Sequence, residues 1–413
     1  MNNNKLVLFQ VRRHVGEIDW LLPILFLLKK KGFKIITYFD DENIYKSLSD
    51  NKNLFNKWKS INTDFFIQKK VEKLFYKILL KFFIYMNSAT KNFFSNYFRI
   101  ILDKIKSKVY DTEKIFKKYT ANNFKLFFLS ENNHSNLYLK FNEKSEIKTI
   151  RFPTTQYIEY ISADRRIRRK NTRNTTILFA DLHLFVSKQE SETYFGNMIK
   201  KYTKKIIYCG NLKYNKWWTN QLYNNIQIKN SKKIKIIVAT RCWEANFSKK
   251  SFKYIIDSIM KLTYQFQNIF IIFKVHPSNK EKIFLKEILS KYVKSKWTIT
   301  KNHIIPASFN CDIGISLNTS ACMDIVSNQV PCIEMWLNDV DNLNMIKSKN
   351  NNQTNFQKLG IVKNVNSYKQ LLNQIGILQI KKKHYKIKKK QYSAFMKINK
   401  TRKSPIKIIN QIL

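Results

Sequence analysis

Cysteine is scarce in this sequence, since 413 residues include five and no two of them form a Cys-x-x-Cys pair. An odd number without tight spacing argues against a disulfide framework and against a zinc site. It favours reduced thiols in a cytoplasmic protein, most of them small buried residues. The five positions are Cys209, Cys242, Cys311, Cys322 and Cys332.

Long apolar runs and repeats are also missing. The apolar run at residues 20–28 is too short to span a bilayer and predicts a buried helix instead. The first residues are polar and then strand-like, which is not the pattern of a signal peptide. No internal repeat of 20–50 residues is visible, and the length is sufficient for two domains.

Acidic residues are outnumbered, with 28 Asp and Glu against 76 Lys and Arg and a formal net charge of +48. Such a charge attracts nucleotides, nucleic acid or anionic lipid. Gly and Pro are rare whereas Lys and Asn are frequent, which is typical of an AT-rich genome, so composition drift on a solvated surface explains the charge equally well. The basic residues are spread along the whole chain instead of clustering, and a nucleic-acid partner is therefore not expected.

The order of apolar runs and amphipathic segments predicts an α/β fold with parallel sheets. Residues 14–19 are expected to form a loop, and a helix at residues 20–31 is expected to end at Gly32. The expected strands are 5–12, 33–39, 124–129, 149–152, 176–179, 184–187, 205–208, 233–240, 269–275, 312–317 and 331–335. Helices are expected after Ser248 and at 280–292 and 321–327.

Changes in composition divide the chain into three parts. Residues 1–220 are expected to form an N-terminal domain, with a basic helical insertion at about 55–120. An Asn/Lys-rich linker leads into a second domain at 221–380, and 381–413 form a basic C-terminal tail or helix. The insertion is explained either by core-facing helices with solvated lysines or by a surface that lies on anionic lipid.

Polar side chains follow two expected strands of the second domain. Arg241 follows one strand, where a guanidinium can bind a diphosphate or simply lie on the surface. His276 follows the next strand and precedes Pro277, which stops the strand. An imidazole there is either structural or a donor to a phosphate, and as a cation it would offset charge on a leaving diphosphate. Because ligands bind beyond the carboxyl ends of parallel strands, we expect these side chains to converge.

A third cluster lies at the start of the helix expected at 321–327. The hydroxyls of Thr319 and Ser320, with free backbone N–H groups, make an anion site or an ordinary helix cap. Asp324 lies about one turn further along, where a carboxylate can accept both hydroxyls of a ribose or stay solvated.

A catalytic base is expected in the N-terminal domain. His14, Glu17 and Asp19 lie on the first expected loop and face the expected cleft, with Glu131 and His134 as second candidates. Each is also explained as a solvated loop side chain, so the loop as a whole is a better candidate than any one member. Asp339 and Asp341 form an Asp-x-Asp pair that is expected to be a solvated loop, and no metal site is expected.

Taken in order, these motifs resemble the C-terminal half of GT-B-type transferases of bacterial surface carbohydrates. The motifs are His276-Pro277, Thr319 to Asp324, and Val330 to Ile333. The pattern is most similar to the CDP-glycerol glycerophosphotransferases, the bacterial polysialyltransferases and the capsule polysaccharide transferases. Residues 210–218 also resemble the turn that ends the N-terminal domain in such proteins, with Leu212 where proline is usual and Asn215 where aspartate is usual.

The resemblance implies two Rossmann-like domains facing a cleft, with the nucleotide donor on the C-terminal domain and the acceptor on the N-terminal one. It implies a metal-independent glycosyltransferase of capsule or lipooligosaccharide synthesis that needs no cofactor. Its substrates would be a CMP-, CDP- or UDP-activated sugar or polyol and an oligosaccharide or lipid-linked acceptor. The location would be cytoplasmic, peripheral on the anionic inner membrane, with the C-terminal helix crossing back to the first domain. A nucleotide-sugar 2-epimerase on the same fold, and a non-catalytic membrane- or nucleic-acid-binding protein, remain as alternatives.

Overall fold

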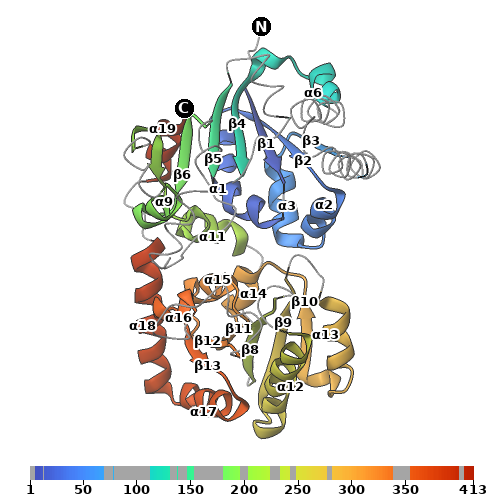
Figure 1. The fold of residues 1–413 in the computed structure, drawn as a ribbon, viewed down its shortest axis with the longest axis vertical. Coiled ribbons are helices and arrows are strands. Elements are labelled where there is room, and N and C mark those ends of the chain that lie inside the picture. The colour runs from blue at the N-terminus through green and yellow to red at the C-terminus, as the bar shows by residue number, and fades with distance from the viewer. Residues whose placement is uncertain are drawn as a thin grey trace, which may run out of the picture.

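Two parallel β-sheets organise the chain, one in each half (Figure 1). The computed structural model describes residues 5–12, 14–68, 78, 112–130, 137, 147–152, 180–195, 203–223, 233–241, 248–276, 281–337, 354–399 and 404–413. The two sheets and their helices form separate domains, as the sequence predicts, while the expected residue boundaries of the domains stay predictions.

The N-terminal sheet has seven strands in the order β3-β2-β1-β4-β5-β6-β7. Every pairing is parallel. The strands are β1 (Leu6–Val11), β2 (Lys34–Phe39), β3 (Asp64–Ile67), β4 (Phe124–Ser130), β5 (Lys148–Phe152), β6 (Leu182–Phe185) and β7 (Ile206–Tyr208). The helices are α1 (Gly16–Lys30), α2 (Glu42–Ser49), α3 (Lys52–Ile61), α6 (Thr112–Lys118), α9 (Lys188–Phe195) and α11 (Lys216–Tyr223).

The C-terminal sheet has six strands in the order β10-β9-β8-β11-β12-β13, again all parallel. The strands are β8 (Ile234–Ala239), β9 (Ile269–Lys274), β10 (Trp297–Thr300), β11 (Ile313–Ser316), β12 (Cys332–Met335) and β13 (Lys363–Val365). The helices are α12 (Lys249–Gln265), α13 (Lys282–Leu289), α14 (Ile304–Phe309), α15 (Ala321–Ser327), α16 (Asn355–Lys358) and α17 (Tyr368–Gln379).

Helices cover both faces of each sheet, which explains why the central strands are apolar without alternation. Along β8, Ile236 and Val238 join the core that contains α12 and α17, whereas Ile237 and Ala239 join the core that contains α14 and α15. A Cβ at Gly314 of β11 would lie 2.5 Å from Ile325, so a glycine there allows α15 to pack against the sheet.

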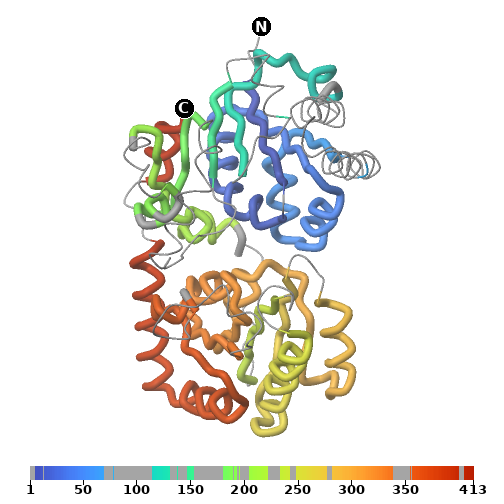
Figure 2. Tube along the Cα trace, viewed as in Figure 1, coloured from blue at the N-terminus to red at the C-terminus, as the bar shows by residue number. Residues whose placement is uncertain are grey.

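The chain returns to the N-terminal domain at its end, as the resemblance implies. Helix α18 (Lys381–Asn399) lies along one side of the C-terminal domain, and α19 (Pro405–Ile412) lies beside the N-terminal sheet (Figure 2). Ile408, Ile409 and Ile412 are buried in the N-terminal core with α1. Lys148 Nζ of β5 donates to the carbonyl oxygen of Ile412 at 2.8 Å.

Two expectations need correction. The first helix begins at Gly16 instead of residue 20, so Glu17 and Asp19 lie on its first turns and not on a loop. Residues 64–67, inside the range expected as a helical insertion, form the edge strand β3. The sequence did not predict this strand because Asp64–Ile67 is short and none of its four residues is fully buried. Most of the predicted basic helices, and the strand expected at 176–179, lie outside the described residues.

The cysteines behave as predicted where the structure describes them. Cys209, Cys311, Cys322 and Cys332 are buried free thiols, and burial raises the pKa of Cys311 to about 12. Within the described ranges, no helix combines the length and the apolar character that crossing a membrane requires.

Candidate functional site

A pocket lies between the two domains, where the carboxyl ends of the C-terminal strands face α1. In both sheets the strand order reverses at the centre, between β1 and β4 and between β8 and β11. Such switch points are where open α/β sheets bind ligands. The pocket has about 1050 Å³ of empty volume, including its open mouth. Its described lining includes His14, Asp19, Asn51, Lys213, Tyr214, Thr240, Lys274, His276, His303, Thr319, Ser320 and Asp324.

His276 lines this pocket from the end of β9. Its backbone N–H donates to Glu281 Oε1 at 2.8 Å, and Thr240 Oγ1 donates to the same oxygen at 3.0 Å. Burial, and then the positive charges of Arg241 and His14, lower the pKa of His276 to about 4. The imidazole is therefore neutral at neutral pH in the free protein, and its role toward a leaving diphosphate stays a prediction. Pro277 lies outside the described residues.

Arg241 follows β8, as the sequence predicts, and its described hydrogen bond is made to the protein backbone. Its Nη1 donates to the carbonyl oxygen of Asn318 at 2.7 Å, and it is not among the described residues that line the pocket. Asn318 has a φ of 45°, in the left-handed region. Arg241 thus joins the ends of β8 and β11 and supports the turn that presents Thr319 and Ser320.

Thr319 and Ser320 line the pocket beside the start of α15, which spans the residues that the sequence predicts. Thr319 Oγ1 accepts a hydrogen bond from the backbone N–H of Ala321 at 3.4 Å. Ser320 is the residue before the helix, and its side chain makes no capping hydrogen bond. Both hydroxyls are placed at the pocket surface, and their binding of an anion stays a prediction.

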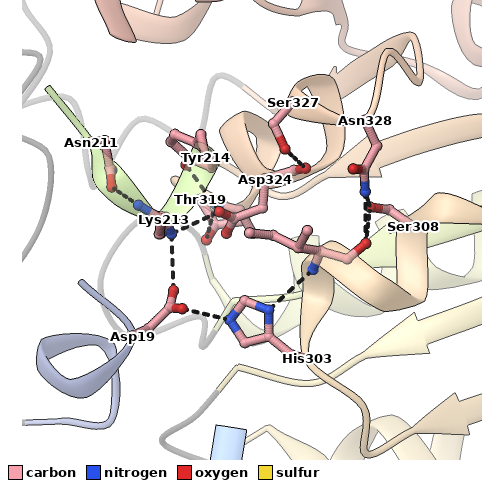
Figure 3. A network of polar contacts seen from close by, with 12 residues as sticks. Asp19, Asn211, Lys213, Tyr214, His303, Ser308, Thr319, Asp324, Ser327 and Asn328 are labelled. Carbon is pink, nitrogen blue, oxygen red and sulfur yellow. Dashed lines mark hydrogen bonds and ion pairs between the residues drawn. The ribbon is translucent and has the colours of Figure 1, made fainter. Parts of the chain in front are cut away.

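Asp324 is the centre of a polar network that joins the domains (Figure 3). Its Oδ1 lies 2.7 Å from Lys213 Nζ and accepts a hydrogen bond from Tyr214 OH at 2.9 Å. Lys213 Nζ also donates to Asp19 Oδ2 of α1 at 3.0 Å. Burial alone would lower the pKa of Lys213, but Asp19 and Asp324 outweigh burial and hold the pKa well above its usual range. The ammonium group therefore bridges one carboxylate from each domain.

His303 completes the network from the N-terminus of α14. Its Nδ1 accepts from the backbone N–H of Ile305 at 3.3 Å, so the ring proton of the neutral form is on Nε2. Nε2 lies 3.1 Å from Asp19 Oδ1. Burial alone would raise the pKa of Asp19, but His303 and Lys213 outweigh it and hold the pKa below its usual range.

Three network members were missed as individual residues by the sequence analysis: Lys213, Tyr214 and His303. Lys213 and Tyr214 lie in the turn at 210–218, which drew attention only as a motif. That motif was the available signal, because a polar and aromatic turn between two domains is a place for such contacts. Nothing in the local sequence of His303 distinguishes it from an ordinary helix cap.

The three residues expected to supply a base have three different environments. Asp19 pairs with Lys213 and His303 in the network. His14 lines the pocket, and its Nδ1 accepts from the backbone N–H of Gly16 at 3.1 Å, which leaves Nε2 as a donor in the neutral form. A Cβ at Gly16 would lie 2.8 Å from this nitrogen, so glycine permits the contact.

Glu17 is fully buried and is not among the described pocket residues. Its Oε2 accepts from the backbone N–H of Arg12 at 2.8 Å. Burial raises the pKa of Glu17 to about 7, with the charge of Asp40 adding to the effect. This carboxyl group therefore exchanges its proton near neutral pH, next to Ser130 at the end of β4. Glu131 and His134, the second candidates, lie outside the described residues.

No cluster of three or more His, Cys, Asp or Glu side chains arranged for a metal ion occurs in the part of the chain that the structure describes. Asp339 and Asp341 are outside that part.

No protein-family model and no curated protein matches the chain. Solved structures do match its fold. UDP-GlcNAc 2-epimerase from Neisseria meningitidis, bound to UDP-GlcNAc, superposes with a TM-score of 0.56 at 10% identity, covering 99% of both chains. Anabaena Alr3699/HepE, in complex with UDP-glucose, gives 0.52 at 12% identity over 98% of both chains. A glycosyltransferase from Rickettsia africae ESF-5 gives 0.50 at 14% identity, over 99% of this chain and 97% of that one. The expected GT-B-like fold is thereby confirmed.

Proposed function

We propose that the chain is a GT-B-type glycosyltransferase of bacterial surface polysaccharide synthesis, of capsule or lipooligosaccharide. It transfers a sugar or polyol phosphate from a CMP-, CDP- or UDP-activated donor to a glycan or lipid-linked acceptor. One observation carries this proposal: His276, after β9, and Thr319 and Ser320, after β11, line one pocket at the switch point of the C-terminal sheet. Two fold neighbours that contain UDP-sugars add support.

The donor diphosphate would lie against these three side chains. Neutral His276 donates an N–H to a phosphate oxygen, and a bound anion favours its protonation as negative charge develops on the leaving diphosphate. His14 offers a second donor from the opposite domain. Arg241 acts through the turn at Asn318 instead of contacting phosphate. Asp324 Oδ1 is taken by Lys213 and Tyr214, so a ribose hydroxyl would bind Oδ2.

Glu17 is the proposed catalytic base. A base works best when its pKa lies near the operating pH, and the pKa of about 7 meets this condition. Its carboxyl group is buried and does not line the described pocket, so the acceptor hydroxyl would have to reach it at the carboxyl end of β4, next to Ser130. Replacement Glu17→Gln is expected to lower kcat with little change in KM for the donor.

The experiment supplies CMP-, CDP- and UDP-activated sugars with oligosaccharide and lipid-linked acceptors and measures nucleotide release. Release that depends on the acceptor supports a transferase. A donor that is bound and released unchanged with every acceptor argues against it.

A nucleotide-sugar 2-epimerase is the second candidate, favoured by the fold neighbours that carry that name. An epimerase converts the donor without an acceptor. Proton NMR of a UDP-sugar incubated with the protein alone would reveal the second epimer, and that product would replace the transferase proposal.

We expect the protein to act at the cytoplasmic face of the inner membrane, with α18 supplying a basic surface. Lys381, Lys382, Lys383, Lys386, Lys389 and Lys390 are exposed along it. Tyr385 is 62% exposed among them and can insert at the level of lipid headgroups. Co-sedimentation with anionic but not with neutral vesicles tests this surface. Salt-sensitive binding without any nucleotide specificity would favour the non-catalytic alternative.

A further inference from the structure

A second pocket opens next to the first. It has about 470 Å³ of empty volume and shares Val15, Asn51, Lys274, Val275 and His276 with the larger pocket. Its other described lining residues come from both domains: Ser47, Asp50, Lys282, Ile299, Thr300 and Lys301. The two pockets are therefore adjacent and share the wall that contains Lys274 and Asn51, so that two adjacent groups of a substrate pair can occupy them.

Lys274 is the most unusual group in this wall. It is the last residue of β9, and side chains along this strand alternate between buried and partly buried, so Lys274 and His276 share the partly buried face. Among the described residues, no ion pair involves Lys274. Burial lowers its pKa to about 8, against the opposing effect of Asp50. A mostly buried ammonium group without a paired carboxylate needs another anion to offset its lost hydration.

The described lining of the small pocket contains more basic than acidic residues, which also favours an anionic ligand. Lys274, Lys282 and Lys301 line it, against the single carboxylate of Asp50. At the same wall, Asn51 is 8% exposed and its Oδ1 is buried without a hydrogen-bond partner. A buried amide oxygen that lacks a donor is costly, and a hydroxyl group of a ligand would supply one. Ser47 and Thr300 add hydroxyls that can donate to or accept from a sugar.

We infer that the small pocket binds an acidic sugar, with its carboxylate or phosphate on Lys274 and a sugar hydroxyl on Asn51 Oδ1. The inference rests on the proposed function, because it makes this sugar part of the acceptor or of the transferred group next to the donor diphosphate. It adds a specificity: neutral sugars lack the anion that Lys274 requires. Either a carboxylate or a phosphate can accept from this ammonium group, so separate probes must distinguish them.

The test is calorimetric titration of the full chain with glucuronate, glucose 6-phosphate and glucose, with and without saturating UDP. At least one acidic sugar is expected to bind, more tightly than glucose and also in the presence of UDP. Lys274→Met is expected to weaken that binding about tenfold or more, because a hydrogen bond to a charged group is lost. Lys301→Met, at the exposed rim, is expected to weaken it about threefold. Lys253→Met, on the exposed side of α12, is the matched control and should change nothing.

Other outcomes overturn the inference. Equal binding of glucose and both acidic sugars, or no binding of any, would show that the pocket selects no anion. A loss of UDP affinity in Lys274→Met as large as the loss for the acidic sugar would assign Lys274 to the donor diphosphate alone. If an acidic sugar binds in a Lys274-dependent manner while no nucleotide binds, the pocket inference holds and the proposed function fails.

Discussion

The two domains share one strand order, but they place their polar residues in different environments. Counted within each sheet, both follow the order 3-2-1-4-5-6, with one further strand in the N-terminal sheet. In the C-terminal domain, His276 and Thr319 each follow a separate strand and reach the pocket. In the N-terminal domain, His14, Glu17 and Asp19 come from one short segment and diverge into a pocket wall, a buried core and an ion network. Position at a strand end thus accounts for His276 and Thr319 in one domain, whereas tertiary contacts decide the environments of the three residues in the other.

The largest expected effect comes from breaking the network that connects the domains. Lys213→Met removes the only shared partner of Asp19 and Asp324 in the described network and leaves two buried carboxylates with weaker compensation. The free energy of unfolding is expected to fall by about 3–5 kcal/mol. Urea denaturation measures it, and Lys216→Met, exposed on α11, is the control. A loss as small as that of the control would mean that the network contributes little to holding the domains together.

The next effect is the pH dependence of stability that two buried carboxyl groups cause, one in each domain. Burial raises the pKa of Glu17 and of Glu334 to about 7. A folded-state pKa above the unfolded value means that the native state binds the proton more tightly. Its stabilising contribution is therefore complete below about pH 4.5 and is lost as the pH rises through 7. For each group, the free energy of unfolding should fall by about 3 kcal/mol between these limits, an upper estimate for such buried sites.

Gln substitution removes this pH dependence and tests the comparison. Glu334→Gln keeps an oxygen for Thr354 and Gln357, so the stability of the variant relative to wild type should rise from pH 5 to pH 8 without loss of turnover. Glu17→Gln should show the same pH trend but lower kcat by about 100-fold or more. Denaturation at both pH values and steady-state kinetics distinguish the two. Equal kcat in both variants would remove Glu17 from the mechanism.

Much of the C-terminal domain could be predicted from sequence, because strand exits and helix starts follow local rules. The helix at 321–327 and the cap at Ser248 are found where they were expected. The role of Arg241 could not be predicted, because a guanidinium at a strand exit reaches a ligand and a neighbouring carbonyl oxygen equally well. Lys213 bonds to Asp19 across 194 residues and Tyr214 to Asp324 across 110, and neither sequence spacing nor periodicity encodes such partners.

The smallest expected effect compares the two histidines that face the pocket from opposite domains. His276→Ala should weaken nucleotide binding about tenfold or more, since a donor to phosphate is lost from a buried site. His14→Ala should weaken it only about threefold, since this histidine lines the pocket from the N-terminal domain, away from the strand ends proposed to hold the phosphates. Titration calorimetry of both variants gives the ratio. An equal or reversed ratio would place the main phosphate contacts in the N-terminal domain.

The central claim is that the pocket between the domains holds an activated pyrimidine nucleotide on the C-terminal strand ends. Its most direct test is calorimetric titration of the wild-type chain with CMP, CDP and UDP. The account predicts that at least one of them binds with a Kd of about 1–100 μM, and that Thr319→Val together with Ser320→Ala weakens that binding. No binding of any of the three at millimolar concentration, or binding unchanged by the double substitution, would contradict it.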